Sequence, residues 1–282
     1  MASPAAGSIY AGWAAPKASS TAAASKPGKG GKPPVAAAGI ADAFLQMQAV
    51  VGAKAAARGV RYRLGEAKEP ALSFDEDFVH DPKEKPTALD RLSWVKWGAM
   101  RTGADAFTDL GLRKLEDATE AYQHYRDGTG ADLPIDYEKA YSEDSVVRDA
   151  VDKEIRTAQR DAETISAATG AGEFEMTGDS VGVGSGATEN WQKTIGRHII
   201  WGSAYVRVSG DQFEMTITIH EIDRYNFNRG EKDIESGTPD DVNGRFAVLG
   251  WAKSFLTRGK VKRYVAWKRG DPGSSTIHQV VD

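Results

Sequence analysis

Residues 213–220 read Phe-Glu-Met-Thr-Ile-Thr-Ile-His, with apolar side chains at odd positions and polar ones at even positions. Successive side chains of a strand point to opposite faces, so this period of two predicts a β-strand with one buried face. The turn sequence Ser209-Gly210-Asp211 precedes it, and residues 199–208 also favour a strand. Together they predict two antiparallel strands.

A helix start follows this sheet pattern. Residues 238–241 read Thr-Pro-Asp-Asp, which supplies a threonine cap, a proline at the first helical position and acids in the first turn. The inner face of this helix is predicted to hold Val242, Phe246, Leu249, Ala252 and Phe255. Gly259 is predicted to end the helix, and residues 261–268 to form a last strand. The predicted fold class is α+β, a helical region followed by a small antiparallel sheet with a packed helix.

Segments before the sheet carry a helical period. Thr87 can cap a helix, Asp109 a second, and residues 145–168 predict a third. The stripe of the third helix consists of Val147, Val151, Ile155, Ala158, Ala162 and Ile165. Residues 40–58 also favour a helix, with small residues on one face. We interpret these stripes as core positions.

Composition shifts suggest how the chain is divided. The predicted organisation is a disordered low-complexity segment at 1–38, a helical domain at 39–168, a glycine-rich linker at 169–190 and an α+β domain at 191–282. Residues 66–90 are rich in acids and prolines and predict a solvated loop. The glycines of 182–186 do not predict a phosphate loop, because no Lys-Ser/Thr pair follows them.

Charge and cysteine content limit the possible functions. The chain has 282 residues, a net charge of −4 and no cysteine. Nucleic acid is therefore an unlikely partner by bulk electrostatics, and disulfides and thiol catalysis are excluded. The first residues do not have the pattern of a signal peptide, so we expect that any secretion uses a route without a cleaved signal.

The predicted site lies where the alternating strand ends. Asp223, Tyr225, Asn226 and Arg229 place a carboxylate, a phenol, a carboxamide and a guanidinium within seven residues. Such a group can bind a divalent metal or activate water against a phosphoryl group, so we predict catalytic roles for it, with Asp223 as the metal ligand. Asparagine and aspartate also favour ordinary turns, which is the structural alternative. His220 is a further catalytic candidate.

A basic stretch follows the site. Residues 242–270 contain no acid, and aromatic residues are interleaved with the cations. The predicted substrate-binding residues are Arg245, Lys260, Lys262 and Arg263. Such a surface attracts phosphate groups or an anionic lipid surface. The alternative is a solvated face whose aromatic residues belong to the core.

Residues 195–270 resemble the activity domain of colicin M-type bacteriocins. That family carries Asp-x-Tyr-Asp, then five residues, then His-Arg. The matching positions are Asp223, Tyr225, Phe227 and Asn228. Asn226 stands at the second aspartate of the motif, and Lys232-Asp233 stands at the His-Arg pair. His220 is the nearby candidate to replace the missing histidine.

The resemblance implies a function at the cell envelope. Members of the family cleave lipid II, the lipid-linked pyrophosphate precursor of peptidoglycan, in a reaction assisted by Mg²⁺. The order of low-complexity head, helical middle and compact tip is also similar to type VI secretion effectors. This likeness implies a cognate immunity protein, a secretion-system spike or chaperone component as partner, and action in the periplasm or at the inner membrane of a target bacterium.

Three alternative functions remain open at this point. A non-enzymatic toxin could damage membranes by inserting residues 199–222 as an amphipathic hairpin or by using the basic tail. A cytoplasmic nuclease toxin could use the same tail to hold nucleic acid. A binding module without catalytic activity, or a structural protein of a secretion apparatus, is a third alternative.

Overall fold

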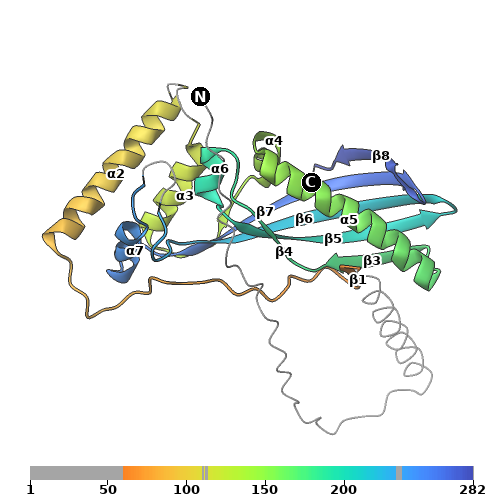
Figure 1. The fold of residues 1–282 in the computed structure, drawn as a ribbon, viewed down its shortest axis with the longest axis horizontal. Coiled ribbons are helices and arrows are strands. Elements are labelled where there is room, and N and C mark those ends of the chain that lie inside the picture. Colours follow the sequence, from red (N-terminus) through yellow and green to blue (C-terminus); the bar gives the residue numbers. More distant parts are fainter. Residues whose placement is uncertain (1–59, 110, 112–113, 233–236, 282) are drawn as a thin grey trace, which may run out of the picture. The chain divides into compact units, whose positions relative to one another are not determined.

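The two predicted strands are the centre of an eight-stranded sheet in the computed structural model (Figure 1). Strand β5 (His198–Ser209) and strand β6 (Gln212–Tyr225) pair antiparallel along their whole length. The turn between them uses Gly210, whose φ of 62° is a conformation that glycine adopts without steric cost. The prediction from the alternating pattern is therefore confirmed.

The structure describes residues 60–281 apart from 110, 112–113 and 233–236, so the segments predicted at 1–38 and 40–58 lie outside it. The other elements are β1 (Tyr62–Leu64), α2 (Ala88–Asp109), α3 (Glu116–Asp127), β2 (Leu133–Pro134), α4 (Tyr137–Glu143), α5 (Ser145–Thr169), β3 (Glu173–Gly178), β4 (Val181–Val183), α6 (Glu189–Thr194), α7 (Asp241–Val248), β7 (Phe255–Lys268) and β8 (Asp271–Gln279).

The sheet has the strand order β1-β3-β5-β6-β7-β2, while β4 also pairs with β5 and β8 with β7. Every pairing is antiparallel except that of the two-residue β2 with β7. The α+β class is confirmed. The sheet is larger than predicted, because the first half of the chain supplies β1 and β2, the segment predicted as a linker supplies β3 and β4, and residues 271–279 supply β8.

Helix α5 covers one face of the sheet (Figure 1). Its predicted stripe is fully buried, with Val151 and Ala158 at 0 % exposure, and it packs in one cluster with Met215, Ile217 and Ile219 of β6. We call this side of the sheet the helix-covered face. The opposite side, which carries Thr216, Thr218 and His220 of β6, is the outer face.

A second, aromatic core lies at the end of β6 and β7, where α2, α3 and α7 meet (Figure 1). Tyr125 of α3, Phe246 of α7 and Phe255 of β7 are almost completely buried there. Trp94 of α2 meets Phe246 edge to face, with ring centroids 5.0 Å apart. This cluster fixes the position of the strand ends that carry the predicted site.

The glycine-rich segment 169–190 is not a linker, which corrects the predicted division into domains. It forms β3 and β4 and leads into α6, and it belongs to the same compact unit as the rest of the described chain. One of its glycines, Gly178 of β3, has a packing role: the ring of Tyr62 lies against it and against Gly202 of β5, and a Cβ atom at either glycine would collide with Tyr62. The Tyr62 hydroxyl then donates to Glu154 of α5 at 2.8 Å.

Three predicted boundaries are also wrong. Asp109 ends α2 and does not cap α3, which begins at Glu116. Helix α7 ends at Val248, because Gly250 adopts a φ of 70° and the chain turns into β7. Gly259 consequently lies inside a strand and ends no helix.

Residues 65–81 contain no helix or strand, as predicted for a loop, but they are bound to the sheet. We call them the strap. The Glu66 carbonyl accepts a hydrogen bond from Thr177 at 3.0 Å, and Glu69 pairs with Arg258 at 2.9 Å. Further along, the ring of Phe78 packs onto Gly244 of α7. The strap therefore crosses the outer face and is anchored at the aromatic core.

The packing of Tyr62 against Gly178 and Gly202, which we call the Tyr62 slot, gives a first testable prediction. A methyl group at Gly202 would fall on the Tyr62 hydroxyl, so we expect Gly202→Ala to lower the free energy of unfolding by about 1–3 kcal/mol. Gly184→Ala, in open space within the glycine-rich segment, is the control and should change it by less than about 0.5 kcal/mol. Urea unfolding measures both, and equal midpoints for the two variants would contradict the slot.

Candidate functional site

Two carboxylates lie side by side at the end of β6. Glu221 and Asp223 continue the odd-numbered positions of the strand and therefore point to the helix-covered face, below Ile219. Their Cα atoms are about 7 Å apart, the distance of two residues along a strand. The shared face that the sequence predicted for Asp223 and Tyr225 is confirmed, because β6 runs to Tyr225. Glu221 was not predicted.

The position of the carboxylate pair changes its proton affinity. Glu221 is 2 % exposed, and burial together with the nearby negative charge of Asp223 raises its pKa to about 8. Asp223 is half-buried, and burial raises its pKa to about 7. Both carboxyl groups therefore titrate near neutral pH, far above the usual values for these side chains.

Strand β7 holds Glu221 in place. The Thr257 hydroxyl donates a 2.9 Å hydrogen bond to Oε1 of Glu221, whereas the buried Oε2 has no hydrogen-bond partner among the described residues. Gly259 stands directly opposite Glu221, and a Cβ there would lie 2.7 Å from Cβ of Tyr137 and 3.2 Å from Glu221 Oε2. The absence of a side chain at this glycine makes room for the carboxyl group.

Further buried polar groups extend the site beneath α4. The Tyr137 hydroxyl shares a 2.7 Å hydrogen bond with Nε2 of His198, the first residue of β5. Burial lowers the pKa of His198 to about 4, so its ring is neutral at pH 7. Burial also raises the pKa of Tyr137 well above its usual value, and the charge of Glu221 adds to this rise. Glu221 therefore lies within electrostatic reach of this pair.

The remaining residues of the predicted motif are engaged by the strap and the aromatic core. Tyr225 stacks on Phe255, with ring centroids 4.9 Å apart. The Asn226 amide donates to the carbonyl of Asp75 at 2.6 Å. The guanidinium of Arg229 lies over Phe78, 4.6 Å from the ring centroid. These contacts fix the loop after β6, and they direct Asn226 and Arg229 toward the strap.

His220 does not belong to the Asp223 site. It lies on the outer face, where its ring stacks on Trp201 at 3.9 Å and its Nε2 is 3.0 Å from the Ser203 hydroxyl. Burial lowers the pKa of His220 to about 4. Since the sheet separates it from Asp223, the prediction that His220 replaces the missing histidine of the motif is wrong.

The four predicted substrate-binding cations do not form one surface. Arg263 is buried on the helix-covered face and binds Glu138 through two hydrogen bonds of 2.6 and 2.9 Å. Lys260 and Lys262 have even positions on β7 and lie on the outer face. Arg245 lies on α7 and pairs with Glu84 at 2.6 Å. The cations of the basic stretch therefore lie in three different places: the helix-covered face, the outer face and helix α7.

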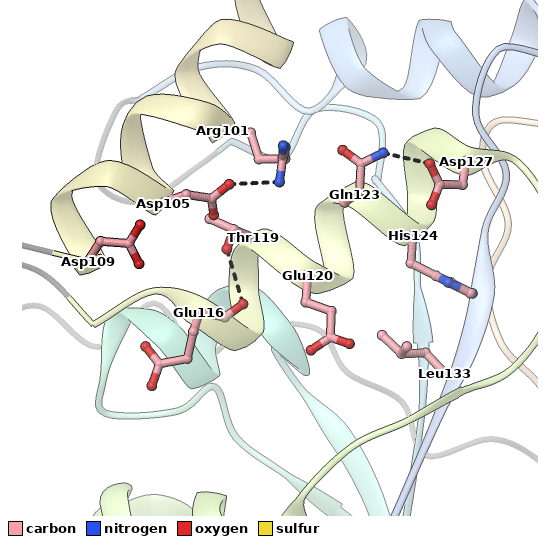
Figure 2. A pocket seen from close by; sticks show the side chains of 10 residues that line it. All are labelled: Arg101, Asp105, Asp109, Glu116, Thr119, Glu120, Gln123, His124, Asp127 and Leu133. Carbon is pink, nitrogen blue, oxygen red and sulfur yellow. Dashed lines mark hydrogen bonds and ion pairs between the residues drawn. The ribbon is translucent and has the colours of Figure 1, made fainter.

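A pocket of about 490 Å³ lies elsewhere, between the end of α2, helix α3 and Leu133 of β2 (Figure 2). Half of its ten lining residues are acidic, and two of the ten form an ion pair, Arg101 with Asp105 at 2.8 Å. Asp223 does not line it. An acidic lining repels phosphate, so this pocket does not suit an anionic substrate.

The resemblance implies Mg²⁺, and the carboxylate pair fits such an ion. Mg²⁺ in proteins usually takes one or two carboxylates and keeps several of its water ligands. The carboxylate of Asp223 can supply one donor, and the unpartnered Oε2 of Glu221 can supply the second when that carboxyl group is ionised. In the part of the chain that the structure describes, no group of three or more His, Asp or Glu side chains is arranged around a metal position.

Comparison with known proteins identifies no related protein. No protein-family model, no curated protein and no solved structure matches this chain. Among residues 60–281, no helix is long and apolar enough to cross a membrane.

The raised pKa of Glu221 predicts how stability depends on pH. The folded state holds this proton up to about pH 8, whereas an unfolded glutamate releases it near pH 4.3. The contribution of Glu221 to stability is thus fully present below about pH 4 and is lost as the pH rises through 8. Glu221→Gln cannot ionise, so its unfolding free energy relative to the native protein should rise by on the order of 3 kcal/mol between pH 5 and 9.

Urea unfolding at several pH values measures this difference. Glu175→Gln on β3 is the matched control for the loss of a glutamate, because that side chain is exposed. A constant offset for Glu221→Gln across the same range would show that Glu221 is already ionised in the folded protein.

Proposed function

We propose that this chain is an antibacterial effector that hydrolyses a phosphate ester or pyrophosphate linkage, with Asp223 as its acid–base group. One observation carries the proposal: Asp223 and Glu221 are adjacent carboxyl groups whose pKa values are raised to about 7 and 8. Acid–base catalysis is most efficient when the pKa of the group lies near the working pH. Perturbed carboxyl pairs of this kind are typical of catalytic sites.

The two carboxyl groups have different tasks in this proposal. Asp223 is half-buried and is the one that can meet substrate, taking a proton from the attacking water. Glu221 is buried beside it and is mostly protonated at pH 7, so it tolerates the charge of Asp223 without a second negative charge. Glu221 is therefore a positioning residue.

The substrate class follows from the resemblance of residues 195–270 to colicin M-type domains. It is a lipid-linked pyrophosphate at the envelope of a target bacterium. A Mg²⁺ ion held by the carboxylate of Asp223 would neutralise phosphate charge. An immunity protein in the producing cell and a secretion-system component for delivery complete the proposal, with action in the target periplasm or at the inner membrane.

The structural surroundings favour hydrolysis over the membrane-damaging alternative. Insertion of residues 199–222 as a hairpin would remove the two central strands from the sheet. Ile217 and Ile219 are 0 % exposed in the core, so this route requires unfolding of the whole unit. The nuclease alternative needs a continuous basic surface, whereas Arg263 is buried against Glu138 and Arg245 is paired with Glu84.

Substitution of the two carboxylates tests the proposal. We expect Asp223→Asn to lower hydrolysis of a lipid-linked pyrophosphate by about 10²–10⁴-fold, because it removes the base. Glu221→Gln mimics the protonated form and should stay within about tenfold of the native rate. Asp211→Asn, in the exposed turn after β5, is the control and should leave the rate unchanged.

The same variants are produced in the periplasm and, separately, in the cytoplasm of a sensitive bacterium. Hydrolysis at the envelope predicts toxicity in the periplasm alone, and its loss in Asp223→Asn. A folded Asp223→Asn protein that remains fully toxic would remove the enzymatic function, and degraded nucleic acid in cytoplasmic expression would identify a nuclease.

A further inference from the structure

Helix α2 exposes an unusually apolar surface. Leu89, Leu92, Val95 and Met100 are 73, 66, 65 and 44 % exposed, respectively. A helix has 3.6 residues per turn, so these four residues lie along one side, together with the exposed Ala99. We call this side the outer stripe of α2. Contiguous exposed apolar patches on soluble domains usually mark a binding surface.

The outer stripe is not needed to attach α2 to the protein. The opposite side of the helix supplies that contact through Trp94, which meets Phe246 and Trp251, and Trp97, which meets Tyr122. The helix therefore has two apolar sides, of which the aromatic core uses one. The outer stripe is left without a described partner.

The exposed charges of α2 before Asp109 have one sign. Arg91 and Lys96 are both exposed, Lys96 within the stripe and Arg91 at its margin, and no described residue forms an ion pair with either side chain. The acids of α2 that precede Asp109 are turned inward and occupied. Asp90 accepts hydrogen bonds from Thr87 and pairs with Arg245 at 3.5 Å, and Asp105 pairs with Arg101. The stripe thus combines exposed aliphatic side chains with cations.

We propose that the outer stripe of α2 binds the surface of an anionic phospholipid bilayer, with the helix lying in the plane of the interface. A helix with an apolar stripe and lysine or arginine beside it is the pattern of interfacial helices. The helix has 22 residues and is about 33 Å long, so it offers an extended contact. Its aliphatic side chains enter the headgroup–acyl boundary while its cations meet lipid phosphates.

Charge complementarity favours a bilayer over a second copy of this chain. Two copies packed through the stripe would bring Arg91 and Lys96 of both helices together without an acid to offset them. An anionic bilayer supplies both the negative charge and the hydrocarbon. This inference rests on α2 alone and does not depend on the hydrolase assignment.

Vesicle co-sedimentation of the full chain tests the proposal, with vesicles of phosphatidylcholine alone and with one third phosphatidylglycerol. We expect binding to the anionic vesicles and at least about tenfold weaker binding by Leu92→Ser/Val95→Ser, because two aliphatic side chains no longer enter the boundary. Lys96→Gln should weaken binding about fivefold, and added salt should weaken it further. The matched control Ile277→Ser/Val281→Ser removes two exposed apolar residues near the other end of the chain and should bind as the native protein does.

The residues chosen are exposed, so the variants should fold, and their thermal unfolding is compared with that of the native protein. Equal binding by the α2 variant and the control would overturn the proposal, as would no binding to anionic vesicles. Analytical ultracentrifugation tests the other candidate partner of the stripe, a second copy of this chain. A dimer that Leu92→Ser/Val95→Ser abolishes, without vesicle binding, would assign the stripe to a second copy and equally overturn the proposal.

Discussion

The packing of α5 on the helix-covered face is the interaction on which the rest of the structure depends. Its aliphatic stripe closes the core over β5 and β6, and each large side chain buried there contributes about 1.5–3 kcal/mol. The same helix also holds the edge of the sheet. Glu154 accepts a hydrogen bond from the Tyr62 hydroxyl. One carboxylate oxygen of Asp161 accepts hydrogen bonds from the backbone N–H groups of Arg61 and Tyr62. One helix therefore supports both the central strands and β1, where the strap begins.

The sequence predicted elements with a long, regular period and missed those without one. Strands β5 and β6 and helix α5 could be predicted, because burial on one face imposes that period on many residues. Strand β8 could not, because eight of its nine residues are exposed and its pattern does not alternate. Strand β1 has three residues, too few for any period. The end of α7 was misplaced because helical spacing continued by chance to Phe255, while Gly250 turns the chain.

The candidate site could be predicted in part from the alternation of odd and even positions along β6. Asp223 and Tyr225 were placed on one face, and the same rule assigns Glu221 to it. The available signal was an acidic residue at a position where β6 is otherwise apolar. His220 has an even position on β6 and Asp223 an odd one, so the alternation of the strand places them on opposite faces. The resemblance to a motif that needs a histidine led instead to the expectation that they act together. The contacts of Asn226 and Arg229 with the strap join distant parts of the chain, so no local pattern could reveal them.

The strap has a consequence for the order of events during synthesis. Its hydrogen bonds to the end of β6 join residues 148 and 151 positions apart, through Glu76 with Arg224 and Asp75 with Asn226. At about 5–20 residues per second, the ribosome needs roughly 7–30 s to make the partner after the strap. During that interval Trp94 and Trp97 have no aromatic core to enter. The nascent chain therefore depends on protection from aggregation until β6, α7 and β7 have emerged.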